Sequence, residues 1–251
     1  MYFITDLDKT LIYSTPKDGV CVERKPDKEI TYVTKPAFDI LNKLLNNPSF
    51  NLVPCTLRSY EQTMRVDFIR NSNLKYIICD NGATIYVDGE LDKEWDKHVD
   101  TIIDKDKVKR VYEKMNQHIS ENEIPIYMLK SNRDAFISII FNNVEDSSIF
   151  LDGLISFVDD DFKIFKQGKK TYIVPKKLNK NIAIKYLKDK YSIKDIVTSG
   201  DSNVDEEFVK EGNIQILPKH SVFFTEDAIV TEKEGIKAGE EILQIIYSLT
   251  Y

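Results

Sequence analysis

The chain has 251 residues, of which 42% are hydrophobic and 30% are charged, and its formal net charge is −6. This composition is ordinary for a globular protein of one large or two modest domains. The acidic balance argues against a nucleic-acid partner, and the sequence has no uncharged apolar run long enough to predict a membrane span.

The cysteines and the N-terminus bear on the compartment. Cys21, Cys55 and Cys79 are an odd number, so they cannot all pair, and their spacing fits no zinc site. The N-terminus lacks the basic and apolar regions of a secretory signal. We therefore expect a cytoplasmic protein with free thiols that begins at its first strand, and we leave open whether it is a monomer or a homodimer.

The first eighty residues alternate between strand and helix patterns. Tyr2–Thr5 belongs to an apolar run that predicts a buried strand, and the alternation in residues 19–34 predicts a hairpin that turns at Pro26-Asp27. The next expected elements are a helix over 36–46, a strand over Leu52–Cys55, a helix over 59–70 and a strand over Tyr76–Cys79. This βαβαβ order predicts a doubly wound parallel sheet.

The pattern changes after Asn81-Gly82. The expected order becomes α-β-β-α-β-β, an open-faced α+β unit. Its elements are a helix over Lys107–Ile119, strands over Ile126–Leu129 and Ala135–Phe141, a helix over 146–157, and a hairpin of Phe162–Phe165 and Thr171–Val174. We expect residues 84–172 to form this inserted unit and residues 1–83 and 173–251 to form a discontinuous α/β core.

The α/β alternation then returns. The expected elements are a helix over 181–190, a strand over Ile196–Ser199, a helix over 203–211, strands over Ile214–Leu217 and Ala228–Val230, and a closing helix over Glu240–Tyr247. The same sheet can therefore continue after the insertion.

The loop after the first expected strand is Asp6-Leu7-Asp8-Lys9-Thr10. Two carboxylates two positions apart diverge along a strand, but a bend beyond the strand can aim both at one point. That point can hold a hard cation such as Mg²⁺, which prefers oxygen ligands. One carboxylate can then attack phosphorus while the other transfers protons. The alternative is an acidic loop that caps a helix.

Three further elements follow in a fixed order. Thr56 ends the second expected strand, Lys180 lies at the start of a helix, and a later strand ends just before Asp201 and Asp205. Ligands of parallel sheets bind beyond the carboxyl ends of the strands, where Asp6 also lies. Alone, Thr56 is typical of a cap and Lys180 of a solvated helix. Their combined order favours a site for phosphate and Mg²⁺.

This ordered set resembles the motifs of the haloacid dehalogenase (HAD) superfamily of phosphohydrolases. The four motifs match, in order, Asp6 to Thr10, Thr56, Lys180, and Asp201 with Asp205. The match runs from residue 3 to about residue 210. The inserted unit, and the string Asn81-Gly82-Ala83 at its entry, resemble the Cof-type branch. The resemblance implies a Rossmann-like core with an inserted α+β cap.

The resemblance also implies a role for each residue. Asp6 would be the nucleophile that forms an aspartyl-phosphate, and Asp8 would protonate the leaving oxygen and then activate water. Thr56 and Lys180 would bind the transferred phosphoryl group. The implied cofactor is Mg²⁺, with ligands from Asp6, the backbone carbonyl of Asp8, and Asp201, while Asp205 orients these groups or binds the ion through water.

The sequence departs from the family at two points. The second motif is often Thr-Gly-Arg, and here it is Thr56-Leu57-Arg58; Arg58 is a candidate substrate contact. The fourth motif commonly has Asn before its second Asp, and here that residue is Val204, so Ser202 or Asn203 would substitute or the metal site would be looser.

The function predicted from the resemblance is a Mg²⁺-dependent phosphatase that acts on a small phosphorylated metabolite, such as a sugar phosphate. A phosphomutase of the phosphomannomutase type is an alternative, but it needs cap residues that grip a second phosphate, and Arg133 is one of few candidates. A binding or regulatory protein of weakened activity is the other alternative. The segment from Val53 to Trp95 also has a local similarity to HAD hydrolases of bacterial stress and tellurite-resistance gene clusters, which implies no substrate.

Overall fold

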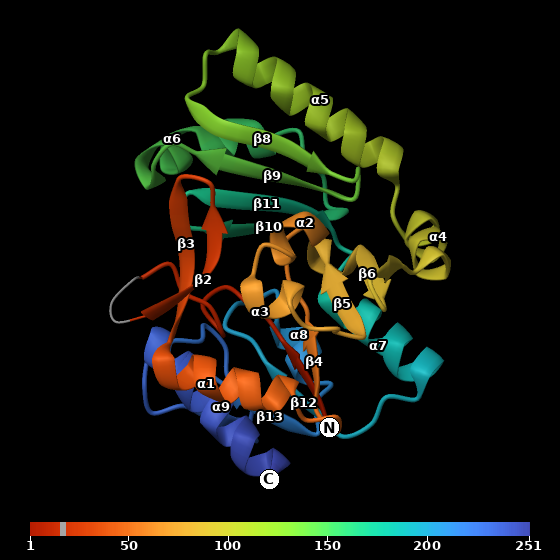
Figure 1. Cartoon of the computed structure of the whole chain (residues 1–251). Helices are drawn as coiled ribbons and strands as arrows, with labels where there is room; N and C mark the ends of the chain where they lie inside the picture. The colour runs from red at the N-terminus through yellow and green to blue at the C-terminus, as the bar shows by residue number, and fades with distance from the viewer. Residues whose placement is uncertain (16–18) are drawn as a thin grey trace. The chain divides into compact units, whose positions relative to one another are not determined.

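The computed structural model describes residues 1–15 and 19–251 and divides into two compact units (Figure 1). The core unit comprises Met1–Trp95 and Asn179–Tyr251, and the inserted unit comprises Asp96–Leu178. The predicted insertion, residues 84–172, begins and ends earlier in the chain. None of the helices in the described residues is long and apolar enough to cross a membrane.

A parallel sheet forms the centre of the core unit. Its strand order is β14–β13–β12–β1–β4, and every neighbouring pair is parallel. The strands are β1 (Tyr2–Thr5), β4 (Asn51–Pro54), β12 (Ile196–Ser199), β13 (Ile214–Leu217) and β14 (Ile229–Val230). The predicted doubly wound α/β class is confirmed.

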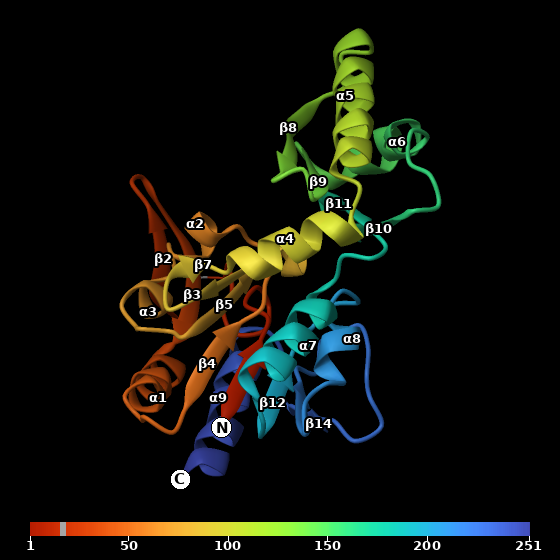
Figure 2. The same cartoon turned by 90° about the vertical axis from the view of Figure 1, so that its right-hand side faces the viewer.

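Helices cover both faces of this sheet. Helices α1 (Lys35–Leu45) and α9 (Ile236–Thr250) pack against each other on one face, while α7 (Lys180–Tyr191) and the short α8 (Glu206–Val209) lie on the other (Figure 2). Because apolar strand residues such as Phe3 and Ile4 are fully buried, the sheet needs cover on both sides. Leu41 of α1 and Ile242 of α9 belong to the same hydrophobic cluster as Phe3.

Tyr76–Cys79 continues the parallel sheet, as predicted, but only through one parallel bridge, and its full ladder is antiparallel. This strand, β5, pairs antiparallel with β6 (Thr84–Val87), which pairs with β7 (Glu90–Leu91). Its link to β4 is one bridge between Cys55 and Ile78. The N–H of Cys55 faces β1, so position 54 faces β5, and Pro54 has no N–H to donate there. The pairing of β5 with β6 also keeps residues 84–91 in the core unit.

The single helix expected over residues 59–70 is two short helices, α2 (Tyr60–Thr63) and α3 (Asp67–Arg70). Ser59 and Gln62 form the predicted capping box at the start of α2. Val66 then has extended backbone and forms a bridge with Glu23, so the helix cannot run through it. The hairpin of β2 (Gly19–Lys25) and β3 (Lys28–Thr34) turns where it was predicted to turn.

The inserted unit has the predicted αββαββ order. Its antiparallel sheet has the strand order β10–β11–β9–β8, and its helices pack on that sheet around buried Val111, Met115 and Phe141. The elements are α5 (Lys105–Glu121), β8 (Ile126–Asn132), β9 (Phe136–Phe141), α6 (Val144–Ile155), β10 (Phe162–Gln167) and β11 (Lys170–Pro175). Helix α4 (Lys93–Ile102) precedes them and was not predicted, although Trp95, Val99 and Ile102 have helical spacing.

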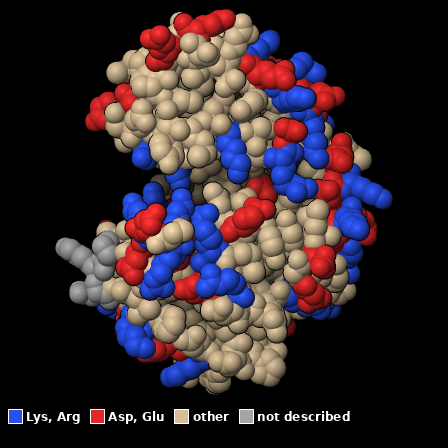
Figure 3. All heavy atoms as spheres, turned by 45° about the horizontal axis from the view of Figure 1, so that its top comes forward, with Lys and Arg blue, Asp and Glu red and all other residues tan. Residues whose placement is uncertain are grey.

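Charged side chains of both signs are intermixed on the face of the molecule shown in Figure 3. Basic residues there lie beside acidic ones. This distribution fits the modest net charge of −6.

Candidate active site

Adjacent strands of the parallel sheet end at the same level, and this brings the predicted site residues together. Thr5 at the end of β1 lies opposite Pro54 of β4 and Ser199 of β12. The next residues continue the contact, because the Asp6 N–H donates to the carbonyl of Ser199 at 2.9 Å and the Cys55 N–H donates to the carbonyl of Thr5 at 2.8 Å. Asp6, Thr56 and Asp201 therefore follow neighbouring strand ends, as the switch-point rule predicts.

Lys180 links two of the acids. Its Nζ donates to Asp6 Oδ1 and to Asp205 Oδ1, each at 2.6 Å, and its side chain is 1% exposed. Asn179 caps α7 by accepting from the Ile182 N–H at 3.0 Å. Gly82 sets the place of this helix start: its φ is +92°, and a Cβ there would lie 2.5 Å from the carbonyl oxygen of Asn179. The fold thus fixes the lysine by a close backbone approach that only glycine allows.

Asp205 organises the loop that follows β12. Its second oxygen, Oδ2, accepts from the N–H of Asp201 at 3.2 Å, the N–H of Ser202 at 2.9 Å and the Ser202 hydroxyl at 2.6 Å. A Cβ at Gly200 would lie 2.5 Å from Asp205 Cβ, so the loop can close only with glycine there. Ser202 is one of the two residues expected to compensate for Val204, and it is the one in contact with Asp205.

The cluster carries more negative than positive charge. Burial raises the pKa of Asp6, and the charges of Asp205, Asp201 and Asp8 add to this effect while Lys180 opposes it. Burial and the charge of Asp205 raise the pKa of Asp201 to about 7, although the Thr10 hydroxyl donates to it at 3.3 Å. Burial lowers the pKa of Lys180, but Asp205 and Asp6 outweigh it and the net shift is upward, so the ammonium keeps its charge.

This excess of charge fits a divalent cation. One carboxylate oxygen each of Asp6, Asp201 and Asp205 lies within 4.8 Å of the others. With all three acids ionised and Lys180 protonated, the net charge of the four side chains is −3 + 1 = −2. Buried carboxylates of this kind are stable when they are paired or bind a metal, and hard oxygen donors suit Mg²⁺.

Asp8 and Arg58 form a second group beside the cluster. Arg58 Nε and Nη2 donate to Asp8 Oδ2 and Oδ1, each at 2.7 Å, and Nη1 donates to Glu23 Oε2 at 2.9 Å. The Thr56 hydroxyl accepts from the Arg58 N–H at 3.2 Å, and the side chain of Thr56 is buried. The second motif is therefore tied to Asp8 through the side chain of Arg58.

Glu23 is the site residue that the sequence analysis missed. It lies on β2 with a side chain that is 0% exposed, and it accepts from Arg58, Arg65 and Thr31. The local alternation of the hairpin does not distinguish a buried glutamate from an exposed one. Arg58 and Arg65 come much later in the sequence than Glu23, and no local pattern links them to it. Their pairing with Glu23 becomes apparent only in the folded structure.

Arg133, the other candidate substrate contact, lies in the inserted unit. It follows β8 in the left-handed conformation, with φ of +54°, and its Nη2 donates to Asp96 at 2.9 Å. Both partners belong to the inserted unit. A role in substrate binding stays a prediction.

Among the residues that the structure describes, the cysteines and His220 do not form a rival site. All three cysteines are free and buried, and burial raises the pKa of Cys55 and Cys79, so neither thiol is activated. His220 bridges two loops, with Nε2 at 2.8 Å from the carbonyl of Lys9 and Nδ1 accepting from the Gly235 N–H at 3.2 Å. These are structural contacts.

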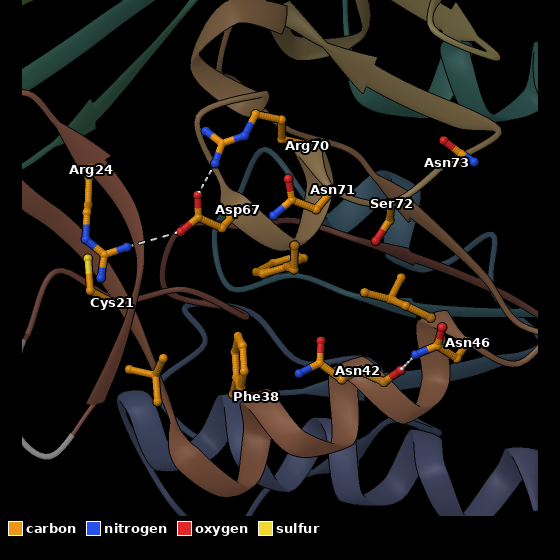
Figure 4. Close-up of a pocket in the computed structure, with 13 residues that line it drawn as sticks. Cys21, Arg24, Phe38, Asn42, Asn46, Asp67, Arg70, Asn71, Ser72 and Asn73 are labelled. Carbon is orange, nitrogen blue, oxygen red and sulfur yellow. Dashed lines mark hydrogen bonds and ion pairs between the residues drawn. The ribbon is translucent and has the colours of Figure 1, made fainter.

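A pocket of about 730 Å³ lies elsewhere in the core unit, between α1, α3 and β2 (Figure 4). Asp67 lies at its edge between Arg24 and Arg70, and Phe38 faces it from α1 (Figure 4). Its lining includes none of the predicted site residues. Its residues are Val20, Cys21, Arg24, Phe38, Asn42, Leu45, Asn46, Asp67, Phe68, Arg70, Asn71, Ser72 and Asn73.

Comparisons with known proteins point to phosphatases. Residues 1–123 match the family model described as sucrose-6F-phosphate phosphohydrolase. The structure is similar to a sucrose-phosphatase of Synechocystis sp. PCC6803 solved with sucrose and phosphate, with a TM-score of 0.65 and 16% identity over 100% of this chain and 98% of that one. The comparison with curated proteins found no match.

Two other solved structures show the same fold. A haloacid dehalogenase-like hydrolase from Bacteroides thetaiotaomicron matches with a TM-score of 0.62 and 13% identity over 98% of both chains. A trehalose-6-phosphate phosphatase from Aspergillus fumigatus matches with a TM-score of 0.52 and 12% identity over 98% of this chain and 92% of that one. At these identities, the likeness establishes the fold.

Proposed function

We propose that this chain is a Mg²⁺-dependent phosphatase. It has the fold of the haloacid dehalogenase (HAD) superfamily, with an inserted α+β unit as in the Cof-type branch of that superfamily. The substrate would be a small phosphomonoester, and a sugar phosphate is the class we favour because the matching family model and two of the similar structures are named for sugar-phosphate phosphatases.

One observation carries this proposal: the buried Lys180 ammonium lies 2.6 Å from both Asp6 and Asp205, with Asp201 in the same cluster. A buried lysine held by ionised acids is well suited to neutralise the oxygens of a phosphoryl group. Phosphoryl transfer depends chiefly on positioning and on such charge neutralisation.

The first chemical step is transfer of the phosphoryl group to Asp6. An Asp6 carboxylate oxygen forms a bond to phosphorus, and the bond between phosphorus and the ester oxygen breaks. The leaving oxygen takes its proton from the carboxylic acid of Asp8. Thr56 and Lys180 hold the phosphoryl oxygens during the transfer, since both side chains are buried and lie at the same end of the sheet.

The second step is hydrolysis of the aspartyl-phosphate. Asp8, now a carboxylate, takes a proton from water, and the resulting hydroxide attacks phosphorus. The bond between phosphorus and the Asp6 oxygen breaks, which releases inorganic phosphate and restores the Asp6 carboxylate. The proton taken from water leaves Asp8 as the carboxylic acid again, which completes the cycle.

Asp6, Asp201 and the backbone carbonyl of Asp8 would hold Mg²⁺. The ion would supply positive charge that lets a phosphate dianion approach the three buried carboxylates. Asp205 would not need to bind the ion directly, because one of its oxygens accepts from Lys180 and the other accepts three hydrogen bonds from the Asp201–Ser202 loop.

The inserted unit would act as a cap that selects the organic part of the substrate. Its insertion into the core unit, and its different architecture, support this division of roles. Arg133 is the residue we propose to contact substrate, because its guanidinium is partly exposed and pairs with Asp96 of the same unit.

The proposal is tested by phosphate release from a panel of phosphorylated sugars, including sucrose-6F-phosphate, and from p-nitrophenyl phosphate. We expect Mg²⁺-dependent turnover of at least one panel member and its loss on addition of a chelator. Absence of turnover on every substrate, or full activity in excess chelator, would contradict the proposed function.

A further inference from the structure

Glu23 is a fully buried carboxylate that lies outside the four family-like motifs. Its Oε2 accepts from Arg58 Nη1 at 2.9 Å and from the Thr31 hydroxyl at 3.1 Å, and its Oε1 accepts from Arg65 Nε at 3.0 Å. Burial of a charge is costly unless the charge is paired and hydrogen-bonded, and Glu23 meets both conditions. Packing alone therefore does not account for a buried charge at this position.

Arg58 connects this buried acid to Asp8. The guanidinium is planar, and its Nε and Nη2 donate to the two oxygens of Asp8 while its Nη1 donates to Glu23. Each of its three nitrogens thus donates to a carboxylate of the protein. Burial lowers the pKa of Arg58, but hydrogen bonds and charges from Asp8 and Glu23 outweigh it, so the guanidinium stays charged.

The three residues differ in how firmly the fold holds them. The side chain of Glu23 is 0% exposed and that of Arg58 12%, whereas that of Asp8 is 52% exposed. A bridge between Glu23 and Val66 also fixes the backbone of β2 against the segment between α2 and α3. The buried Glu23 therefore fixes the orientation of Arg58, and Arg58 fixes that of the more exposed Asp8.

We propose that Glu23 is a positioning residue for proton transfer by Asp8. It holds Arg58 in the plane from which the two parallel hydrogen bonds align the Asp8 carboxyl group. Each carboxyl oxygen has a second lone pair, so Arg58 can hold Asp8 while the other side of the group faces the leaving oxygen or water. This inference rests on the proposed function, and it reassigns Arg58 from a substrate contact to a partner of Asp8.

The predicted signature is a dependence on the leaving group. A strongly basic alkoxide needs a proton from Asp8 when it leaves, whereas p-nitrophenolate leaves without one. The ratio kcat/KM reports the steps up to transfer to Asp6 and is unaffected by the later hydrolysis, in which Asp8 acts on every substrate. Loss of positioning should therefore lower kcat/KM selectively for alkyl phosphates.

The experiment compares Glu23→Gln with wild type on p-nitrophenyl phosphate and on the best sugar phosphate of the panel. Glutamine keeps the shape of the side chain but removes the charge that fixes Arg58. We expect kcat/KM for the sugar phosphate to fall about 10- to 100-fold, the scale expected for a displaced catalytic group, and that for p-nitrophenyl phosphate to fall less than about 3-fold. Burst kinetics of p-nitrophenol release should appear in the variant, because hydrolysis of the aspartyl-phosphate still needs Asp8.

Arg58→Lys is the second variant. It is needed because Glu23→Gln removes the carboxylate that pairs with Arg58 and Arg65, and that variant can fold poorly. Lysine keeps the charge but lacks the fork that aligns both Asp8 oxygens, so the same selective loss is expected. Glu29→Gln is the matched control: Glu29 is an exposed acid on β3 of the same hairpin, paired with Arg24, and its loss should change neither substrate.

The outcomes separate this inference from the proposed function. Selective loss on the sugar phosphate in both variants supports the positioning role. Equal losses on the two substrates, or no loss, overturn that role and leave the phosphatase assignment intact. Absence of wild-type turnover overturns both.

Discussion

The core unit buries a group of charged residues, whereas the inserted unit keeps ion pairs of the same kinds of residue at its surface. In the core unit, Lys180 and its partners Asp6 and Asp205 are buried. In the inserted unit, Lys107 pairs with Asp159 and Asp161, whose side chains are 56% and 78% exposed. Exposed pairs contribute about 0–1 kcal/mol, while buried charges are costly to desolvate.

This contrast separates stability from chemistry. The inserted unit is held together by its apolar cluster, and its ion pairs lie at the surface. The core unit retains three buried carboxylates around one lysine, an arrangement that well-packed apolar residues could replace without loss of stability. We infer that chemistry is the reason for this cluster, so substitutions there should remove activity, and substitutions of exposed charges in the inserted unit should at most alter substrate preference.

The largest effect is expected for Asp6→Asn. The amide cannot attack phosphorus and is a weaker ligand for Mg²⁺, so turnover should fall below about a thousandth of wild type. The fold should survive, because the substitution removes one of three mutually repelling acids. Phosphate release and thermal unfolding measure the two effects. Asp39→Asn, an exposed acid on α1, is the control, and retention of more than a few per cent activity by Asp6→Asn would remove Asp6 from the nucleophile's role.

Lys180→Met should depress kcat/KM for every substrate by about 100- to 1000-fold, because the proposed mechanism places the lysine on the phosphoryl group common to all of them. It should also lower the free energy of unfolding by roughly 3–5 kcal/mol in chelator, since Asp6 and Asp205 lose their cation. Urea unfolding checks this, with Lys185→Met on the exposed face of α7 as the control. A loss confined to one substrate would argue against contact with the phosphoryl group.

The metal-free protein should lose stability as pH rises from about 4 to about 7. The pKa of Asp201 is about 7 in the folded state and about 3.9 in an unfolded chain, so between these values the folded state binds more protons. The contribution of Asp201 is present below the unfolded pKa and is lost as pH rises through the folded pKa; Asp6, whose pKa is also raised, acts in the same direction.

Thermal unfolding in chelator at several pH values, repeated with Mg²⁺, measures this dependence. We expect Mg²⁺ to raise Tm more at pH about 8 than at pH about 5, because it binds the ionised acids. Asp201→Asn should flatten both the pH dependence and the Mg²⁺ effect. A wild-type Tm that rises with pH in chelator while Asp201→Asn shows the same rise would show that Asp201 does not titrate as described.

The smallest effect is expected for Arg133→Ala in the inserted unit. Its partly exposed pair with Asp96 should contribute less than about 1 kcal/mol to stability, so Tm should barely change. KM for the preferred sugar phosphate should rise several-fold while kcat/KM for p-nitrophenyl phosphate stays near wild type. Arg110→Ala, an exposed arginine on α5, is the control. An equal fall in kcat/KM for both substrates would contradict the assignment of substrate selection to the inserted unit and of chemistry to the core unit.

The sequence predicted those features that depend on local order. Apolar runs ending in Asp6 and before Asp201 indicated strands whose ends could meet, and the structure places these residues in one cluster with Lys180. The αββαββ order of the inserted unit was predicted from the spacing of apolar residues along the sequence. Ser59 and Gln62 likewise marked the start of a helix through a local capping box.

Features set by distant partners were not predictable. The pairing of β5 depends on Pro54, which lies where a strand residue would donate its N–H toward β5 and has none to donate. The break in the helix at Val66 depends on the bridge between Val66 and Glu23. The unit boundary expected just after Asn81-Gly82 illustrates the same point. Gly82 is wedged against the start of α7 within the core unit, which sequence spacing could not show.

The central claim is that Asp6 carries the phosphoryl group, and chemical trapping tests it most directly. Wild-type protein turning over its best substrate is quenched in acid and reduced with borohydride, which converts a phosphorylated aspartate to homoserine. Tryptic cleavage after Lys9 yields a peptide that contains both Asp6 and Asp8, and fragmentation in the mass spectrometer distinguishes them. We predict homoserine at position 6 and aspartate at position 8. Conversion at another residue, or none at all while substrate is consumed, would contradict the account.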